Sequence, residues 1–423
     1  MAVQDDSSVA LIPSAYGTSK VYSVIPSNGN GDFDFTRSGN ATRVNKGGYI
    51  ENMGSNVPRL DYPLIDGVVQ SCPALLLEPQ RTNLQIRSEE FSNSAWGKSG
   101  STVTANQVVS PDGSQTADKI NDSGSGTGVV QVFDFVSSLS SGSSYTFSVF
   151  AKKGTIDYIS LRNENFTTPN NSTSYFNISN GTLGTVDTDH TAKIIDYGNG
   201  WYRCSITFTI STDTSGNLVI RANEADNTPN VVRNGTKNVY LWGAMFEQGS
   251  YQTSYIKTTS GQVTRSADAC NGSGTSAEFN DSEGVLFAEF KGFTDTDISN
   301  RYITISDGTI SNSIGIQLRN SGELRLYNNG VVTANMIYRD AFADLSQNFK
   351  IAIKYGTSTS DYKVYINGVS KTVLSGFTAT SISGLDVLNL HYASNTLNFY
   401  GLVKQVMVFK TALTDSELQT LTS

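Results

Sequence analysis

The side chains that most often carry out chemistry in proteins are few and scattered in this sequence. Only two histidines occur, His190 and His391, and neither has neighbours at the spacing of a catalytic triad or a metal site. Each is expected to be a surface residue or a hydrogen-bonded strand residue. No P-loop, dinucleotide-binding glycine motif, HExxH motif or EF-hand loop is present. The sequence therefore predicts no catalytic residue and no cofactor.

The cysteines give the same indication. Cys72, Cys204 and Cys270 are isolated and odd in number, without CxxC spacing. They predict neither a disulfide framework nor a zinc site. Free, buried thiols are the expected state, because free cysteine usually behaves as a small apolar core residue.

Three aspartates lie close together in the segment PDGSQTADKIND. Asp112, Asp118 and Asp122 could hold a structural calcium ion together with backbone oxygens. The alternative is an acidic turn exposed to water, which we favour. No metal is therefore expected, and calcium stays an open alternative.

Sugar cleavage requires two carboxylates about 5–9 Å apart. Catalytic concanavalin-type glucanases carry these acids alternating along one strand. Here the corresponding segments hold single acids, such as Glu289 in LFAEFKGF and Glu323 in GELRLY. We therefore expect a protein that is not an enzyme. Carboxylates from different strands or subunits could still meet, which leaves a hydrolase as an open alternative.

Exposed aromatic rings can stack on the apolar face of a sugar. The candidates are Trp96, Trp201 and Trp242. Trp201 opens an expected strand and Trp242 lies inside another, so core packing is expected for both. Trp96, in FSNSAWGKSG between expected strands, is the candidate glycan-binding residue.

Composition predicts many short strands to carry these side chains. The 423 residues include 38 Gly, 20 Tyr and 20 Phe, and only 16% are charged. β-Branched and aromatic residues pack on pleated surfaces, and Gly and Asn supply turns. The net charge of -8, with scattered Lys and Arg, argues against a nucleic-acid partner.

Length and pattern predict an all-β chain of three units. Residues 1–82 show little alternation of apolar and polar residues. They are expected to form an extended segment that docks on a partner and serves for attachment. Residues 83–258 contain period-two strands such as SYTFSVFAKKG and RCSITFTIS, which predict an antiparallel jelly roll. Residues 259–423 contain eight strand candidates and are expected to form a second antiparallel β-sandwich.

Turn and cap signals support the last unit. Asn-Gly pairs at Asn329 and Asn367, and Asp307-Gly308, are typical of hairpin turns. Thr414 and Glu417 form a capping box that predicts a short C-terminal helix. One short motif, T-R-S-x-x-A, occurs twice, beginning at Thr36 and at Thr264. We assign it no function.

Nothing in the sequence predicts export or membrane insertion. The first basic residue is Lys20, whereas a signal peptide needs early positive charge before a long apolar run. The longest apolar runs are far shorter than the ~20 residues that a membrane helix requires.

Several sequence segments of the chain resemble segments of bacteriophage fibre and spike proteins of head or tail. These segments are DFTRSGNATRVN, GYIENMGSNVPRLDYP, CPALLLEPQRTNL and SEEFSNSAWGKSGSTVTAN. The order of SPDGSQTADKI, YTFSVFAKKG, GNGWYRCSITFT and VYLWGAMFEQGSYQTSYIKT is similar to the carbohydrate-binding-module jelly rolls of that family. From VTRSADACNG onward the chain looks like a laminin G or concanavalin-type lectin domain.

This resemblance implies a virion surface protein. It implies that residues 1–82 attach to other capsid or tail proteins, that the two sandwiches project outward, and that the chain is a homotrimer. Host attachment through bacterial surface glycans is the expected function, and no catalytic residue is implied. A capsid or tail decoration protein without glycan binding, and a tailspike depolymerase, are the alternatives. Whether the protein sits on head or tail stays open.

Overall fold

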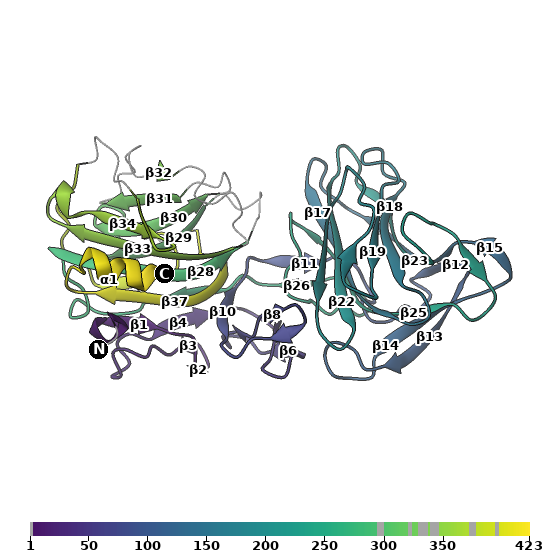
Figure 1. Cartoon of the computed structure of the whole chain (residues 1–423), viewed down its shortest axis with the longest axis horizontal. Coiled ribbons are helices and arrows are strands. Elements are labelled where there is room, and N and C mark those ends of the chain that lie inside the picture. The colour runs from purple at the N-terminus through teal and green to yellow at the C-terminus, as the bar shows by residue number, and fades with distance from the viewer. Residues whose placement is uncertain are drawn as a thin grey trace.

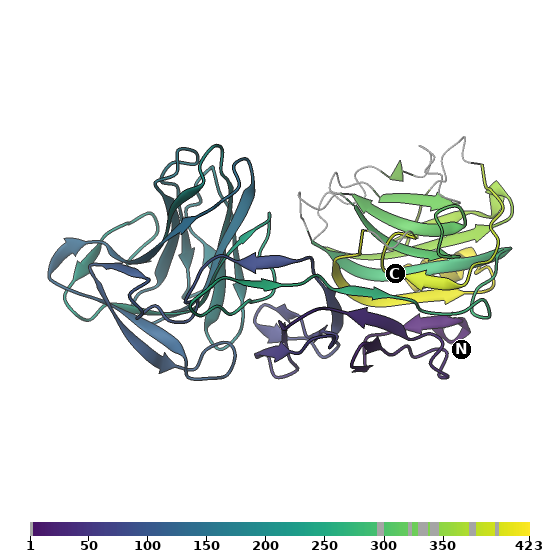
Figure 2. The same ribbon diagram turned by 180° about the vertical axis from the view of Figure 1, so that it is seen from behind.

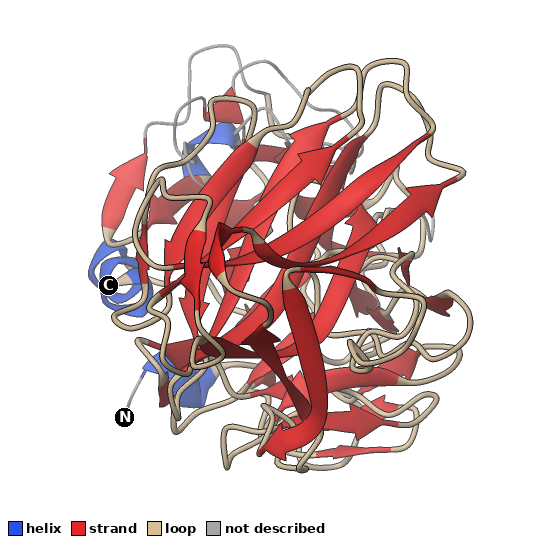
Figure 3. Cartoon of the chain, turned by 90° about the vertical axis from the view of Figure 1, so that its right-hand side faces the viewer, coloured by secondary structure: helices blue, strands red, loops and turns tan. Residues whose placement is uncertain are grey.

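The computed structural model describes residues 3–293, 300–319, 324–328, 337–338, 347–371, 378–393 and 397–423. Two lobes, both built almost entirely of strands, lie side by side along the long axis (Figure 1). Figure 3 shows how strands dominate the chain, with the helix of the C-terminus at one edge. The expected all-β class with a short C-terminal helix is confirmed.

One lobe is built on an eight-stranded antiparallel sheet. Its order is β35 (Val369–Lys371), β34 (Lys363–Ile366), β33 (Asn348–Gly356), β28 (Glu283–Gly292), β37 (Gly401–Phe409), β10 (Ala74–Leu77) and β7 (Leu60–Asp61), with β1 (Val9–Leu11) also on β37. A second sheet faces it, in the order β32 (Ile337–Tyr338), β31 (Leu324–Asn328), β30 (Ser313–Arg319), β29 (Asn300–Ser306) and β36 (Val387–Asn389). Two facing antiparallel sheets make a β-sandwich.

The N-terminal segment completes this sandwich. One edge of β37 pairs with β1 along Val406–Val408 and with β10 along Gly401–Val403. Without these two strands the edge of β37 would expose unpaired N–H and C=O groups. Residues 1–82 were expected to lean on a partner; in the structure the partner is the C-terminal part of the same chain.

The remaining strands of the segment are short pairs beside the sandwich. A small sheet has the order β2 (Tyr16–Gly17), β3 (Lys20–Val21), β4 (Phe33–Thr36) and β27 (Ala269–Asn271). Two hairpins follow, β5 (Ala41–Val44) with β6 (Ile50–Met53) and β8 (Leu64–Ile65) with β9 (Val68–Val69). In β4, Phe33 and Phe35 are buried while Asp34 and Thr36 are exposed, which is the period of a half-buried strand.

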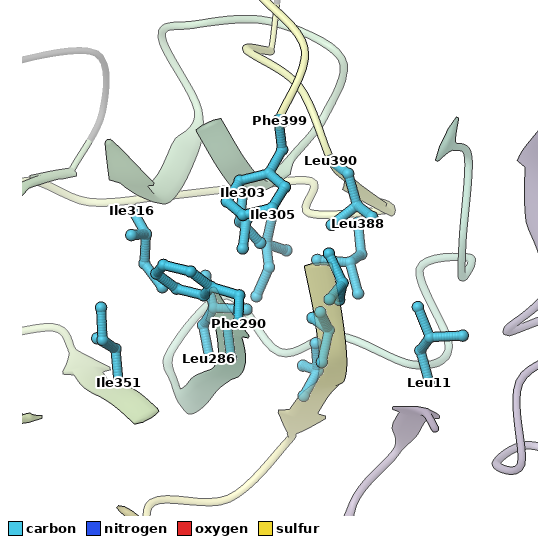
Figure 4. Close-up of a cluster of buried hydrophobic side chains, with 14 of the residues drawn as sticks. Leu11, Leu286, Phe290, Ile303, Ile305, Ile316, Ile351, Leu388, Leu390 and Phe399 are labelled. Carbon is cyan, nitrogen blue, oxygen red and sulfur yellow. The ribbon is translucent and has the colours of Figure 1, made fainter. Parts of the chain in front are cut away.

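A single hydrophobic core joins the N-terminal and C-terminal parts. Leu11 of β1 belongs to the same buried cluster as Leu286 and Phe290 of β28 and Ile303 and Ile305 of β29 (Figure 4). On the other face of the eight-stranded sheet, α1 (Asp415–Thr422) buries Leu418 and Leu421 against Phe287 and Met407. Strand β28 is therefore buried on both faces.

The second lobe is a jelly roll of two six-stranded antiparallel sheets. The first has the order β12 (Gly97–Ser99), β16 (Val130–Ser137), β23 (Ser215–Asn223), β18 (Tyr158–Glu164), β19 (Thr173–Asn177) and β20 (Thr182–Leu183). The second has the order β13 (Ser101–Val108), β14 (Ala117–Asp122), β25 (Asn238–Gln248), β17 (Ser144–Lys153), β22 (Trp201–Thr209) and β21 (Thr191–Asp196). A short pair, β15 (Gly126–Gly128) with β24 (Val231–Arg233), lies beside them.

The core of the jelly roll follows the expected alternation. Tyr145, Phe147 and Val149 of β17 and Ile206 and Phe208 of β22 lie in one buried cluster between the two sheets. The intervening residues point to the other side of the second sheet, where Thr146 and Ser148 of β17 are also buried.

The jelly roll is an insertion into the other lobe. The chain leaves through β11 (Arg81–Asn83) and returns through β26 (Val263–Arg265), which pair antiparallel and run side by side between the lobes (Figure 2). We call residues 84–262 the jelly roll, β11 and β26 the stalk, and the rest the base unit. The structure thus divides the chain differently from three units in series, because strands on either side of the jelly roll share one sheet and one core.

The local signals of the last unit are also present. Asn367 and Gly368 have φ angles of 49° and 76° and form the two-residue turn between β34 and β35. The Thr414 side chain accepts a hydrogen bond from the Glu417 N–H, and the Glu417 carboxylate accepts from the Thr414 N–H, so the capping box is present. Asn329 lies outside the described residues. In the described ranges, no helix is long and apolar enough to cross a membrane.

Candidate functional site

Trp96, the candidate from sequence, lies in the core of the jelly roll. Its side chain is 1% exposed, its ring centroid lies 4.7 Å from that of Phe91, and its Nε1 donates a hydrogen bond to the Arg87 carbonyl at 3.0 Å. Neither face of the indole is open to a sugar ring. The expectation of a glycan platform at Trp96 is therefore corrected to a packing role.

Replacing Trp96 with Phe should destabilise the jelly roll without affecting ligand binding. We expect the free energy of unfolding to fall by about 1–3 kcal/mol, because ring volume is lost and the Arg87 carbonyl loses its donor. Urea unfolding followed by tryptophan fluorescence measures this change, since all three tryptophans lie in the jelly roll. A Trp96→Phe protein that is as stable as the wild type but loses saccharide binding would contradict this role.

Trp201 and Trp242 are core residues, as expected, with 2% and 0% exposure. The three aspartates do not converge on one point, because each accepts hydrogen bonds in a different loop. Asp112 binds Ser110 and Ser114, Asp118 binds the N–H groups of Ser92 and Asn106, and Asp122 binds those of Asn234, Gly235 and Lys237. In the described part of the chain, no three His, Cys, Asp or Glu side chains are grouped to hold a metal.

His190 is a buried, hydrogen-bonded residue. Its Nδ1 lies 2.9 Å from Ser174 Oγ and its Nε2 lies 2.8 Å from Asn163 Oδ1. Burial lowers the pKa of its imidazole from 6.5 to about 4. Ser174 is fully buried, so the contact offers no nucleophile to a substrate.

The jelly roll should lose stability as the pH falls from 6.5 to 4. In this range the unfolded chain binds a proton at His190 that the folded chain does not, so the loss approaches about 3 kcal/mol. Urea unfolding by tryptophan fluorescence at several pH values, on the wild type and His190→Gln, measures the contribution of His190 as a difference in slope. Equal slopes in the two proteins would refute it.

The other residues singled out from sequence are dispersed. His391 is buried in the base unit, with its Nδ1 donating to the Tyr392 carbonyl. Cys204 and Cys270 are buried thiols as expected, whereas Cys72 is exposed because it lies in an open loop before β10. Glu289 pairs with Lys404 at 3.4 Å. Glu323 lies outside the described residues.

A cleft at the junction of base unit and jelly roll has the features of a binding site. Its volume is about 320 Å³, at the lower end of the roughly 300–1,000 Å³ of small-molecule sites. We call it the junction cleft. Its lining comes from the hairpin β5–β6, residues 61–64 and 76–78, the last residues of β28, the beginning of β37, the strands β21 and β22, and the segment 250–255.

The floor of the junction cleft is the outward face of the second jelly-roll sheet. Thr191 and Lys193 of β21 and Arg203, Ser205 and Thr207 of β22 line it. They alternate with the core residues of the same strands, so the period that fills the core also presents hydroxyl and basic groups to the cleft.

Aromatic and carboxylate side chains form the walls. Tyr251 and Phe293 stack with ring centroids 5.0 Å apart and an interplanar angle of 18°, and Tyr197 packs edge-on against Phe150 at 4.8 Å. Asp61 accepts a hydrogen bond from the Val44 N–H at 2.7 Å, and burial raises the pKa of its carboxyl to about 6.

Beneath the cleft, a buried ionic cluster joins base unit, stalk and jelly roll. It consists of Arg37, Arg59, Glu78, Arg265 and Asp268, all of which are at most 2% exposed. Arg59 and Arg265 contact Glu78 at 2.6 and 3.0 Å. Asp268 is paired with Arg37 at 3.1 Å and also with Arg59.

Glu78 also holds the segment that follows β25. The N–H and hydroxyl of Ser254 donate to its two carboxylate oxygens at 2.7 and 2.6 Å. Burial alone would raise the pKa of Glu78, but Arg265 and Arg59 outweigh burial and lower it to about 2. Both oxygens of Glu78 are therefore occupied by partners within the protein, and its carboxylate acts as a structural anion.

Two buried polar atoms at the cleft have no hydrogen-bond partner in the described part of the protein. These are Nε of Arg203 and Oε1 of Gln252, both on residues that line the cleft. Arg203 is 2% exposed, and its Nη1 and Nη2 donate to the Thr253 carbonyl and to Ser148 Oγ. Buried polar groups without partners are costly, but both atoms are too deeply buried for direct contact with a ligand in the cleft.

Comparison with known proteins gives only remote likenesses. No protein-family model matches the sequence, and no curated protein matches it. Among solved structures, the Ruminococcus gnavus IT-sialidase CBM40 is similar at 15% identity and a TM-score of 0.29, covering 36% of this chain and 94% of the other. Domains LG4-5 of the mouse laminin alpha1 chain are similar at 12% identity and 0.24, covering 70% and 88%. A tail fiber protein from an E. coli phage is similar at 11% and 0.23, covering 79% and 41%. Likenesses this remote identify no activity and no ligand.

Sequence reasoning did not find the junction cleft. Its residues come from five stretches that are distant along the chain, and no local pattern links them. One sequence signal for this region was the repeated T-R-S-x-x-A motif. Its two arginines, Arg37 and Arg265, both belong to the ionic cluster under the cleft. The two copies of the motif therefore lie in chain segments that meet in the folded protein.

Proposed function

We propose that this chain is a non-enzymatic bacteriophage virion protein, a fibre or spike of head or tail, that binds host surface glycans in the junction cleft. The observation that carries the proposal is the make-up of the cleft: hydroxyl and basic groups on its floor and aromatic rings on its walls. A saccharide offers hydroxyl groups for the first and apolar ring faces for the second. The resemblance of several sequence segments to phage fibre and spike proteins supports the proposal that the chain is a virion protein.

Attachment to other virion proteins belongs to the same proposal. Ile12, Tyr22 and Val24 on the N-terminal segment are exposed by 37%, 42% and 48%, which favours a contact there. Self-association as a homotrimer would place several clefts on one particle, and multivalency strengthens weak individual contacts. Mass spectrometry of purified virions, and sedimentation of the purified chain, test these two points.

Glycan binding is tested on an array of bacterial surface glycans with the full chain. Phe293→Ala should weaken binding about tenfold or more, because a stacked wall of the cleft is removed. Phe135→Ala is the matched control, since this ring is 62% exposed on β16 of the first sheet and does not line the cleft. Loss of binding in Phe135→Ala with retention in Phe293→Ala would overturn the proposed site.

The non-enzymatic part has its own test. Incubation of the purified chain with host capsule or surface polysaccharide should release no new reducing ends. Release that depends on Asp61 would instead identify a depolymerase, because Asp61 is the cleft carboxylate that forms no direct ion pair with an arginine in the described residues.

A further inference from the structure

The charges of the junction cleft differ in sign from those of the whole chain. The chain carries a net charge of -8. The cleft is nevertheless lined by four basic residues, Arg43, Lys193, Arg203 and Lys291, and by two acidic residues, Asp61 and Glu78. Basic groups are therefore gathered locally on an acidic protein.

The two carboxylates offset only part of this positive charge. Glu78 is already paired with Arg59 and Arg265, and its cluster as a whole has three arginines for two carboxylates. Asp61 is the remaining carboxylate of the lining. Of the cleft's basic residues, Arg43 is paired with Glu51 at 2.6 Å, outside the lining.

Two basic residues of the cleft, Arg203 and Lys291, form no ion pair within 4 Å in the described residues, although Arg203 also acts electrostatically on the buried Glu247. Arg203 donates to a carbonyl and a hydroxyl, and Lys291 forms no ion pair. Arg203 is buried on the jelly-roll side, and Lys291 lies near the end of β28 on the base-unit side, close to Phe293 in sequence. Lys193 is exposed and Lys291 is half-buried, so their ammonium groups are open to a ligand in the cleft, whereas the buried Arg203 adds positive charge beneath them.

We infer that the junction cleft selects acidic saccharides, whose carboxylate is held between the basic floor and Lys291 while the sugar ring lies against the aromatic wall. This inference rests on the proposed glycan binding and adds the class of sugar. Low-dielectric walls of one sign concentrate the field inside a cleft, so an anionic ring is favoured over its neutral counterpart. The negative charge of the rest of the chain keeps polyanions from binding elsewhere without specificity.

Saccharides paired with their methyl esters, which lack the negative charge and carry a methyl group on each carboxyl, test the inference on the full chain. The probes are trigalacturonic acid, a hyaluronan tetrasaccharide and a mannuronate trimer, each beside its methyl-esterified form. Titration calorimetry should show at least tenfold tighter binding of an acid than of its ester, with affinity falling as salt is raised.

Charge variants locate the effect. Lys291→Gln should weaken binding of the acid about five- to tenfold and binding of the ester much less, and Lys193→Gln should act in the same direction. Lys404→Gln, which removes a surface lysine that pairs with Glu289 outside the cleft, is the matched control and should change neither.

The outcomes separate this inference from the proposed function. Equal affinities for acid and ester, or an equal effect of Lys291→Gln on both, would overturn the charge selection while glycan binding stands. Absence of binding to every acid, every ester and the glycan array would overturn both.

Discussion

A chain in which Asn-Gly replaces residues 84–262 is expected to fold into a stable base unit, whereas residues 259–423 alone are expected not to fold. The stalk strands pair Asn83 with Val263, so the two ends of the excised jelly roll lie about 5 Å apart. Asn-Gly closes such a pair as a two-residue hairpin. The spliced chain keeps β1 and β10 on β37, and keeps the core that Leu11, Leu75 and Leu77 share with the C-terminal strands.

The isolated C-terminal stretch lacks these elements. It would expose one edge of β37 and remove eight buried side chains from the core: Val9, Leu11, Val21, Phe33, Phe35, Leu60, Leu75 and Leu77. Each such side chain contributes on the order of 1.5–3 kcal/mol when fully buried, which together is comparable to or larger than the roughly 5–15 kcal/mol stability of a typical domain.

Circular dichroism and thermal unfolding of the two proteins, beside the jelly roll expressed as residues 84–262, provide the measurement. The spliced chain should unfold cooperatively, and residues 259–423 should be unfolded or aggregated. A cooperatively folded 259–423 would show that the N-terminal strands are dispensable and would contradict an inserted jelly roll.

The second large effect is expected at the ionic cluster. Asp268→Asn should lower the free energy of unfolding of the base unit by about 3–5 kcal/mol, because Arg37 and Arg59 remain buried without their shared carboxylate. The Glu78 N–H also loses the charged acceptor to which it donates at 2.8 Å. The cluster is fully buried, so water cannot replace the missing charge.

Asp34→Asn is the matched control, because Asp34 pairs with Lys20 on the surface, where the side chains are 61% and 44% exposed. Such a pair contributes about 0–1 kcal/mol. Urea unfolding followed by circular dichroism should show an early base-unit transition in Asp268→Asn, while tryptophan fluorescence follows the jelly roll separately. An effect of Asp268→Asn no larger than that of Asp34→Asn would contradict a stabilising role for the cluster.

The sequence was sufficient for features that depend on nearby residues. The alternation of Tyr145, Phe147 and Val149 placed the core face of β17, and Asn367-Gly368 and the Thr414 capping box were found where expected. In each case the residues that decide the structure are within a few positions of one another, so a local pattern carries the information.

The pairing of distant strands could not be predicted in this way. Strand β10 has the continuous apolar sequence ALLL and is buried throughout, so it has no period that distinguishes a strand from other buried structure. Its partner, Val403 for Leu75, lies near the other end of the chain. Trp96 illustrates the same limit, because its exposure depends on Phe91 and on the strands that cover it rather than on the polar residues next to it.

Hydrogen–deuterium exchange of the full chain, with and without a saturating saccharide that the array identifies, tests most directly whether the junction cleft binds glycans. We predict slower exchange in β21, β22, the segment 250–255 and the end of β28. No change is expected in the loops around β15 and β24, which do not line the cleft. Protection confined to those distant loops, with the cleft segments unchanged, would contradict glycan binding in the cleft.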